Sequence, residues 1–332
     1  MNSFGKIFRV SIFGESHGNG VGIVVDGVPA GLSLKLDDFL DDLNRRRSGA
    51  KGTTPRNEAD LPKLISGAFN DFTTGAPLTI LFDNTNTRSG DYAKLREIPR
   101  PGHADFVASK KYGGYEDYRG GGHFSGRLTL ALVAAGVIAK KLIQPVQIEA
   151  RLIEAGGMTN IDAAIEKAVE EKDSIGGIVE CKAVNIPIGL GEPFFDSVEA
   201  VLGHMVFSIP AIKGIEFGSG FAAAKMRGST HNDNILTLDG KTETNNAGGI
   251  NGGITNGNEL IFRVAVKPTS STSKKQHTLN IKTGKMDDLE VEGRHDTCIA
   301  LRVPVVLEAA TAIVLADLMM QEQRIPRIIS EQ

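Results

Sequence analysis

Two runs of β-branched and aromatic residues open the chain. Residues 7–13 (IFRVSIF) and 21–26 (VGIVVD) favour strands, and the glycine-rich residues 14–20 between them predict a turn. Leu36, Phe39, Leu40 and Leu43 then recur at the spacing of one helical face, which predicts a helix over residues 36–47. The chain therefore begins with a pair of strands followed by an amphipathic helix.

Further apolar runs alternate with long polar stretches. They predict strands at residues 78–82, 212–217 and 260–266, and buried helices at residues 126–143 and 305–320. Residues 48–60 and 85–111 are polar and without period. Long irregular segments within a compact domain are usually functional or disordered, so both stretches are expected to be loops.

The two halves of the chain resemble each other weakly. Residues 20–32 (GVGIVVDGVPAGL) are similar to residues 176–190 (GGIVECKAVNIPIGL), and a helical pattern follows each, at 36–47 and 195–207. This suggests a duplication with halves of about 1–150 and 151–332, although chance similarity of Gly/Val-rich strands would look the same. No Pro/Ser-rich linker separates the halves, which favours a single domain over residues 1–332.

The order of elements indicates the fold class. Strands come in pairs with helices between them, without the regular alternation of single strands and helices that a doubly wound parallel sheet requires. We therefore predict an α+β fold: a pseudo-duplicated β-α-β sandwich with antiparallel sheets flanking central helices.

Composition narrows the class of protein. Apolar residues make up 41% of the 332 positions and charged residues 23%, and apolar runs are interrupted well before the roughly 18 residues of a membrane span, so a membrane protein and a disordered chain are excluded. The net charge of −3 argues against a general nucleic-acid binder. The N-terminus has no signal-peptide pattern, and Cys181 and Cys298 form no C-x-x-C pair, so a reducing cytoplasm is expected.

Four of the seven histidines lie in glycine-rich or arginine-flanked segments typical of functional loops. They are His17 in GESHG, His103 in RPGHAD, His123 in RGGGHFSGR and His295 in GRHDTC. Histidine transfers protons most easily near neutral pH, so these four are candidates for acid–base chemistry. His204, His231 and His277 lie in a helical pattern or in polar stretches and are interpreted as structural or exposed.

Glycines and basic residues point to an anionic ligand. Residues 119–127 (RGGGHFSGR) precede a predicted helix, where backbone N–H groups can bind an anion, although a flexible turn has the same composition. Further arginines in the presumed loops are Arg45, Arg46, Arg47, Arg88, Arg96, Arg100 and Arg294. In an acidic chain this indicates a compact ligand with phosphate or carboxylate groups. The hydroxyl-rich segment 267–273 (KPTSSTS) and the glycine-rich bend 244–257 either bind part of it or are polar linkers.

Two other patterns are weaker. Residues 218–223 (GSGFAA) fit a dinucleotide fingerprint, but polar residues follow where its helix should continue. Cys298 adjoins Asp296 and His295, and neighbours in sequence do not converge as a catalytic triad does.

Several of these segments occur together in a characteristic order. They are FGESHG (13–18), RPGHAD (100–105), the D-x-R-G-G-G segment from Asp117, NNAGGINGG (245–253), KPTSS (267–271) and GRHDTC (293–298). In this combination the chain resembles the chorismate synthase family over nearly its whole length. The resemblance implies a lyase of the shikimate pathway, which builds aromatic amino acids. Its reaction is the anti-1,4-elimination of phosphate from 5-enolpyruvylshikimate-3-phosphate to give chorismate, dependent on reduced FMN without net redox change.

The resemblance also assigns roles to residues. It implies that His17 lies near the departing phosphate, that His103 protonates the reduced flavin and that Asp296 relays the flavin N5 proton, with Ser16 and Ser125 in support. The flavin contacts it implies are His123, Phe124, Ser125, Pro210, Ala211, Gly252, Lys267, Pro268, Thr269, Ser270, Ser271 and Arg294; the substrate arginines are Arg46, Arg100 and Arg127, and no metal is implied.

Some features depart from the common family pattern. Many members carry arginine at the position of His123, glutamate at Leu128 and a basic residue at Gly52, where Lys51 or Arg56 can substitute. The chain has no long insertion of the kind expected if it reduced its own flavin, so a separate flavin reductase is expected as a partner. The family is tetrameric, which implies a homotetramer. The alternatives are an NADPH-dependent flavin oxidoreductase and a non-catalytic flavin or anion binder.

Overall fold

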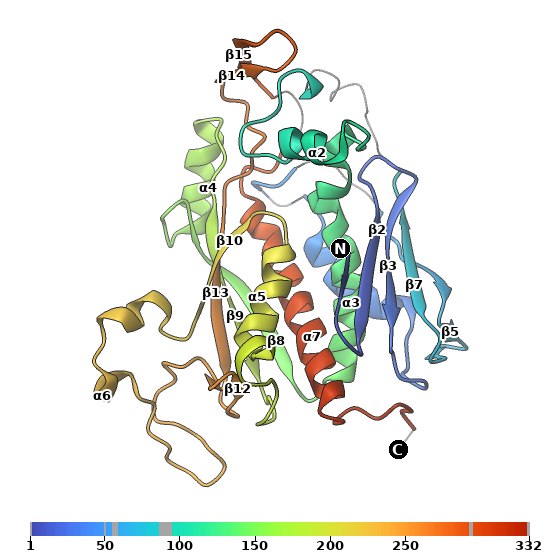
Figure 1. Cartoon of the computed structure of the whole chain (residues 1–332), viewed down its shortest axis with the longest axis vertical. Helices are drawn as coiled ribbons and strands as arrows, with labels where there is room; N and C mark the ends of the chain where they lie inside the picture. Colours follow the sequence, from blue (N-terminus) through green and yellow to red (C-terminus); the bar gives the residue numbers. More distant parts are fainter. Residues whose placement is uncertain (1, 50, 55–58, 86–94, 292–294, 331–332) are drawn as a thin grey trace.

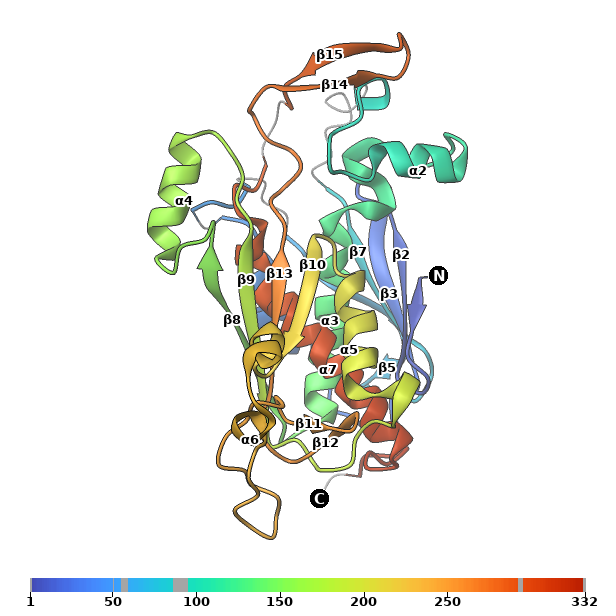
Figure 2. The ribbon, with the colours of Figure 1, turned by 60° about the vertical axis from the view of Figure 1, so that its left-hand side comes forward.

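A layer of helices lies between two antiparallel sheets in the computed structural model (Figures 1 and 2). The structure describes residues 2–49, 51–54, 59–85, 95–291 and 295–330. Over these residues, one sheet has the order β1-β2-β3-β7-β4 and the other β10-β13-β9-β8. Their bounds are β1 Ser3–Phe4, β2 Arg9–Gly14, β3 Gly20–Asp26, β4 Lys63–Ser66, β7 Leu78–Asp83, β8 Gln147–Ala155, β9 Gly177–Val184, β10 Ile212–Phe217 and β13 Leu260–Val266. The predicted α+β sandwich is confirmed.

The helical layer is built around two long helices, α3 (Thr129–Leu142) and α7 (Val303–Gln321), which pack against each other. Gly136 of α3 permits the close approach, because a Cβ there would lie 2.2 Å from the Cβ of Ala309. Beside them lie α5 (Val198–Ser208) and α1 (Leu40–Arg46), which continues from the 3₁₀ helix η1 (Leu36–Phe39). The predicted buried helices are therefore confirmed, and they form the centre of the core.

Helix α7 deserves comparison with a membrane span. Among the described residues, the helical stretch Ile299–Gln321 is long and apolar enough to cross a bilayer by length and composition alone. In this fold 78% of its most apolar window is buried inside the protein. It carries the buried carboxylates of Glu308 and Asp317, and the latter accepts the backbone N–H groups of Lys6, Ile7 and Phe8. Helix α7 is thus a core helix, and its Asp317 side chain holds the N-terminal segment in place through hydrogen bonds.

Alternation along the strands directs one face of each sheet toward the helices. In β9, Val179, Cys181 and Ala183 are buried, whereas the intervening Glu180 and Lys182 face outward. The register pairs β9 antiparallel with β13 and β8. Strands β1, β2, β3, β7 and β4 come from residues before 84, and the other sheet comes from residues after 146. The internal repeat stays a prediction.

Several elements had no clear signal in the sequence. Helix α2 (Asp105–Tyr112) lies within the stretch expected to be a loop, and residues 86–94 of that stretch lie outside the described residues. Others are the strands β4 and β8, the helices α4 (Ile161–Glu170) and α6 (Gly228–His231), and the hairpins β5 (Ala68–Phe69) with β6 (Phe72–Thr73), β11 (Ile250–Asn251) with β12 (Ile254–Thr255) and β14 (Gln276–Asn280) with β15 (Lys285–Leu289). Helix α2 was missed because it lacks an apolar face and lies mostly on the surface.

The segment GSGFAA does not form a dinucleotide-binding turn. It becomes the 3₁₀ helix η6 (Gly220–Lys225) and follows β10, which pairs antiparallel with β13. A dinucleotide fingerprint needs a strand, an α-helix and a parallel strand, so its rejection is supported.

Candidate active site

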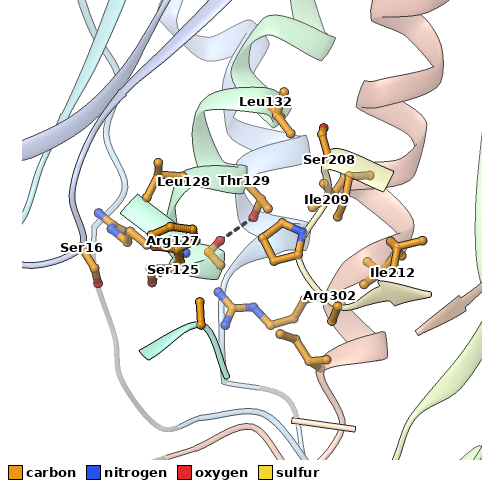
Figure 3. Close-up of a pocket in the computed structure, with 18 of the residues that line it drawn as sticks. Ser16, Ser125, Arg127, Leu128, Thr129, Leu132, Ser208, Ile209, Ile212 and Arg302 are labelled. Atoms are coloured by element: carbon orange, nitrogen blue, oxygen red, sulfur yellow. Dashed lines mark hydrogen bonds between the residues drawn. The ribbon is translucent and has the colours of Figure 1, made fainter. Parts of the chain in front are cut away.

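A cavity of about 760 Å³ opens between the N-terminal strands, the beginning of α3, the end of α5 and the beginning of α7 (Figure 3). This volume lies within the range of small-molecule sites. Figure 3 shows Ser16, Ser125 and Arg127 on one side, Ile209 and Ile212 on the other, and Arg302 between them. The cavity therefore has a polar, basic side facing an apolar one.

Most of the residues predicted for the site line this cavity. They are Ser16, Arg46, Arg100, His103, His123, Phe124, Ser125, Arg127, Pro210, Ala211, Lys267, Pro268, Thr269, Ser270, Ser271 and Asp296. His17 does not reach the lining but adjoins it through Ser16. Gly252 lies in the β11–β12 turn, away from the lining residues, and Arg294 lies outside the described residues. His204 and His295 also line the cavity, and His204, interpreted as structural or exposed, is exposed at its wall.

His17 is buried beside a glycine-rich loop. The 3₁₀ segment η3 (Arg119–Phe124) passes so close that a Cβ at Gly120 would lie 2.1 Å from the His17 Nδ1 atom and 2.9 Å from the Ser16 Oγ atom. Gly120 also has a φ of 59°, in the left-handed region that favours glycine. The glycines of this loop therefore let His17 and Ser16 take their positions.

His103 belongs to a compact group with Arg100 and Asp105. Its Nδ1 atom lies 2.6 Å from the Asp105 Oδ1 atom. Arg100 donates to both Asp105 oxygens, each at 2.8 Å, and to the Ser271 hydroxyl at 3.0 Å. Burial of Asp105 opposes its ionisation, but the hydrogen bonds from Arg100 and His103 outweigh burial and lower the pKa of this carboxyl well below its usual range. Asp105 is therefore an anion in contact with His103.

A cluster of arginines forms the basic side. Arg46 is 3% exposed, and it donates to the Thr129 hydroxyl and to the carbonyls of Gly126 and Arg127. Burial, together with the nearby charges of Arg302 and Arg127, lowers the pKa of Arg46 to about 9, although Asp60 partly offsets this. Arg46 remains a cation near pH 7, although burial and the neighbouring arginines make its charge unfavourable. A bound anion would offset this unfavourable charge.

Two carboxylates partly compensate these cations. Asp60 accepts a hydrogen bond from Arg127, and its Oδ2 atom lies 3.8 Å from the Arg46 Nη1 atom. Asp296 accepts the Thr54 N–H at 2.9 Å and an Arg302 N–H at 3.3 Å. Three guanidinium groups (Arg46, Arg127 and Arg302) thus face two carboxylates, which leaves one net positive charge for a ligand.

Asp60, Arg302 and Asp105 are among the residues of the site that were missed in the sequence. Asp60 and Arg302 carried no local signal, because they join the cluster through contacts across the fold. Asp105 could have been found, since an aspartate two residues after a histidine in RPGHAD is a candidate partner for the imidazole.

The segment 267–271 forms another wall. The Lys267 ammonium donates to the Ser270 hydroxyl at 2.7 Å, and Ser270 donates to the Gly102 carbonyl at 2.8 Å. Burial and the nearby Lys213 lower the pKa of Lys267. Lys213 and Lys267 both line the cavity, so its wall carries a further basic group besides the arginine cluster.

His123 connects the glycine loop to the N-terminal strands. Its Nδ1 atom lies 2.8 Å from the Gly14 carbonyl oxygen, and its Nε2 atom lies 3.1 Å from the Asn2 Oδ1 atom. A carbonyl oxygen accepts only, so Nδ1 carries a proton. The side chain is therefore committed to protein contacts, and it holds Asn2 at the edge of the cavity.

The chain is similar to known proteins over nearly its whole length. A family model described as chorismate synthase matches residues 8–320. A chorismate synthase from Chitinophaga pinensis is 68% identical and covers 99% of both chains, and one from Dehalococcoides mccartyi is 49% identical over 99% of this chain and 100% of the relative. A solved structure titled "Crystal Structure of Chorismate Synthase" superposes with a TM-score of 0.74 at 26% identity, covering 96% of this chain and 93% of that one.

Proposed function

The chain belongs to the chorismate synthase family and catalyses the elimination of phosphate from 5-enolpyruvylshikimate-3-phosphate to give chorismate, and we propose that the reaction takes place in the 760 Å³ cavity. One observation carries this proposal: the cavity joins the GESHG, RPGHAD, HFSGR, KPTSS and HDTC segments, which lie far apart in the sequence. The substrate is an anion, and the basic side of the cavity suits it.

We propose that reduced FMN binds in the same cavity. The apolar wall of Leu132, Ile209 and Ile212 can receive a flat ring system, and the hydroxyls of segment 267–271 with the nearby lysines can bind polar and anionic groups. When bound, reduced FMN would supply a transient electron and an acceptor for the C6 proton. Of the remaining flavin contacts in the proposal, His123, Phe124, Ser125, Pro210 and Ala211 line the cavity, whereas Gly252 and Arg294 rest on the family resemblance.

The arginines would bind and stabilise the departing phosphate. Arg46, Arg127 and Arg302 form the net positive cluster, and guanidinium groups neutralise the charge that develops as the C–O bond breaks. Arg100 donates three of its five side-chain N–H groups to Asp105 and Ser271, so it would bind the substrate with the other two.

The two histidines, which pack against Gly120 and Gly121 of the same loop, would each transfer a proton. His17, beside Ser16 and Gly120, would hold one near the phosphate. His103 would exchange one with a ligand at Nε2, because Nδ1 faces Asp105. Asp296, held by Thr54 and Arg302, would serve as a proton acceptor, with Ser125 in support.

The partners and location complete the proposal. We propose a cytoplasmic homotetramer that receives reduced FMN from a separate flavin reductase. The alternative, an NADPH-dependent flavin oxidoreductase, predicts steady NADPH consumption with FMN in the absence of the enolpyruvyl substrate. The proposed enzyme would consume none.

The decisive measurement is anaerobic phosphate release with chemically reduced FMN, with and without the substrate. We expect release only when both are present, and turnover lower by roughly 10²–10⁴ in His17→Ala and in His103→Ala, the usual contribution of one acid–base group. Wild-type rates in either variant would remove that histidine from the mechanism. No release by the wild-type protein would refute the proposed site chemistry as a whole.

A further inference from the structure

We propose that Asp105 is a positioning residue for the elimination reaction: its carboxylate fixes the tautomer and orientation of His103 and holds Arg100 beside it. This inference rests on the proposed acid–base role of His103. It concerns a residue that makes contact with His103 and Arg100 and would act through them.

Asp105 contacts both other members of the group that it forms with His103 and Arg100. Its Oδ1 atom lies 2.6 Å from the His103 Nδ1 atom and 2.8 Å from the Arg100 Nη2 atom. Its Oδ2 atom accepts the Arg100 Nε–H at 2.8 Å and the Arg100 backbone N–H at 3.2 Å. Four donors therefore converge on one carboxylate, which fixes the carboxylate and both neighbouring side chains together.

These contacts determine the tautomer of His103. Two groups compete for the His103 Nδ1 atom: the Arg100 Nη2 atom at 3.0 Å, whose second N–H could donate only to an unprotonated Nδ1, and the Asp105 Oδ1 atom at 2.6 Å. The carboxylate oxygen is nearer, and two lone pairs would repel each other at 2.6 Å, so Nδ1 carries the proton and shares it with Asp105. The Nε2 atom is then the ring nitrogen that can exchange a proton with a ligand.

The position of Asp105 in the fold makes the arrangement rigid. It is the first residue of α2, where a negative charge interacts favourably with the helix dipole. A Cβ at Gly121 would lie 3.2 Å from the His103 Cε1 atom, so the glycine loop packs closely against the ring. His103 is thus held between a helix start and a loop.

Two groups of opposite charge face His103. Among the described residues, Asp105 and Arg100 contact the imidazole, the η3 loop presents the Gly121 backbone, and segment 267–271 presents the Ser271 hydroxyl to Arg100. Asp105→Asn removes the negative charge beside the imidazole and leaves the guanidinium in place, so the pH–rate profile of the variant should differ from that of the wild type.

The test is Asp105→Asn in the full-length enzyme with reduced FMN and substrate. We expect kcat to fall about 10- to 100-fold, a pH–rate profile that differs from that of the wild type, and partial conversion of His103 to the Nε2-protonated tautomer. The tautomer is measured by ¹⁵N NMR of histidine-labelled protein without substrate, and His103→Gln identifies the signal. An unchanged tautomer and an unchanged pH profile would overturn the proposal.

The chain supplies a matched control. Asp288 lies 3.0 Å from the His277 Nδ1 atom on the exposed β14–β15 hairpin, so Asp288→Asn removes a histidine–aspartate contact outside the cavity. We expect wild-type kcat and pH profile from it, and the same loss as in Asp105→Asn would overturn the proposal.

Two further variants keep the outcomes distinct. If Asp105→Asn fails to fold, Asp105→Glu retains the charge but displaces the carboxylate; a kcat loss of at least tenfold supports the proposal and an unchanged kcat overturns it. If His103→Gln retains wild-type turnover, the acid–base role of His103 fails, whereas the tautomer measurement still decides whether Asp105 positions the ring.

Discussion

Arg46→Met is the substitution for which the structure makes the least intuitive prediction. Arg46 is a buried cation at the proposed phosphate site, with three hydrogen bonds to the protein. Removing such a group from a core usually destabilises a protein. We expect otherwise here: the substitution should abolish phosphate binding with little change in stability.

The magnitude follows from the environment of the guanidinium. Its pKa falls from 12.5 to about 9, so the folded protein disfavours the charge by roughly 5 kcal/mol at 1.36 kcal/mol per unit. The carbonyls that lose Arg46 keep another donor: the Thr129 backbone N–H donates to the Gly126 and Arg127 carbonyls, and the Thr129 hydroxyl donates to the Gly126 carbonyl. The three lost hydrogen bonds come from a charged donor, and because their acceptors keep other partners they cost about 1.5 kcal/mol each, the low end for charged groups. This nearly cancels the cost of burying the charge, so Arg46→Met should be within about 1 kcal/mol of the wild type in stability.

Urea unfolding with and without inorganic phosphate measures both effects. Phosphate at ten times its Kd should stabilise the wild type by about 1.4 kcal/mol and leave Arg46→Met unchanged. The neighbouring Arg45 is the control. It pairs at 2.7 and 2.6 Å with the buried Glu308, outside the cavity, so Arg45→Met should lose about 1–3 kcal/mol and keep the response to phosphate.

Two results would refute this reasoning. A loss of more than about 3 kcal/mol in Arg46→Met would mean that the hydrogen bonds of Arg46 outweigh the cost of burying its charge. A full phosphate response in that variant would mean that the anion binds elsewhere.

The remaining predictions concern the glycine loop and the core carboxylate. Gly120→Ala adds a Cβ 2.1 Å from the His17 Nδ1 atom, so kcat should fall at least tenfold. The control is Gly157→Ala, because Gly157 also has a left-handed φ, of 79°, but a Cβ there would have nothing within 4 Å; this variant should share the backbone strain and keep wild-type kcat. Equal activity of the two variants would contradict the packing argument. Burial of Glu308 opposes its ionisation, but the hydrogen bond from Arg45 and the charge of Lys140 outweigh burial and lower its pKa below 4.5. The ionised Glu308 therefore contributes to stability above about pH 4.5, and this contribution is lost as the pH falls through its lowered pKa. Glu308→Gln should flatten the acid limb of the stability–pH curve, which thermal unfolding at a series of pH values measures. An unchanged acid limb would count against this assignment.

The amino-acid sequence determined the local elements and the chemical segments. Strand β13 was predicted at its observed bounds, and helices α3 and α7 were predicted from apolar composition alone. These predictions succeeded because periodicity and the choice of buried residue types are local properties. The glycine-flanked histidines, the arginines and the KPTSS segment were likewise visible as candidates before their positions were known.

Only the tertiary structure decided which of these groups meet. Thr54 bonds to Asp296 across 242 positions, and Arg302 bonds to the Arg46 carbonyl across 256. No pattern in the sequence encodes such contacts, because they depend on how the two sheets enclose the helices. The same packing put Gly252 in a turn away from the cavity, although its segment was as rich in glycine as the one that packs against His17. Residue types are fixed by the chain itself, whereas the charge balance of the cavity depends on distances that exist only after folding.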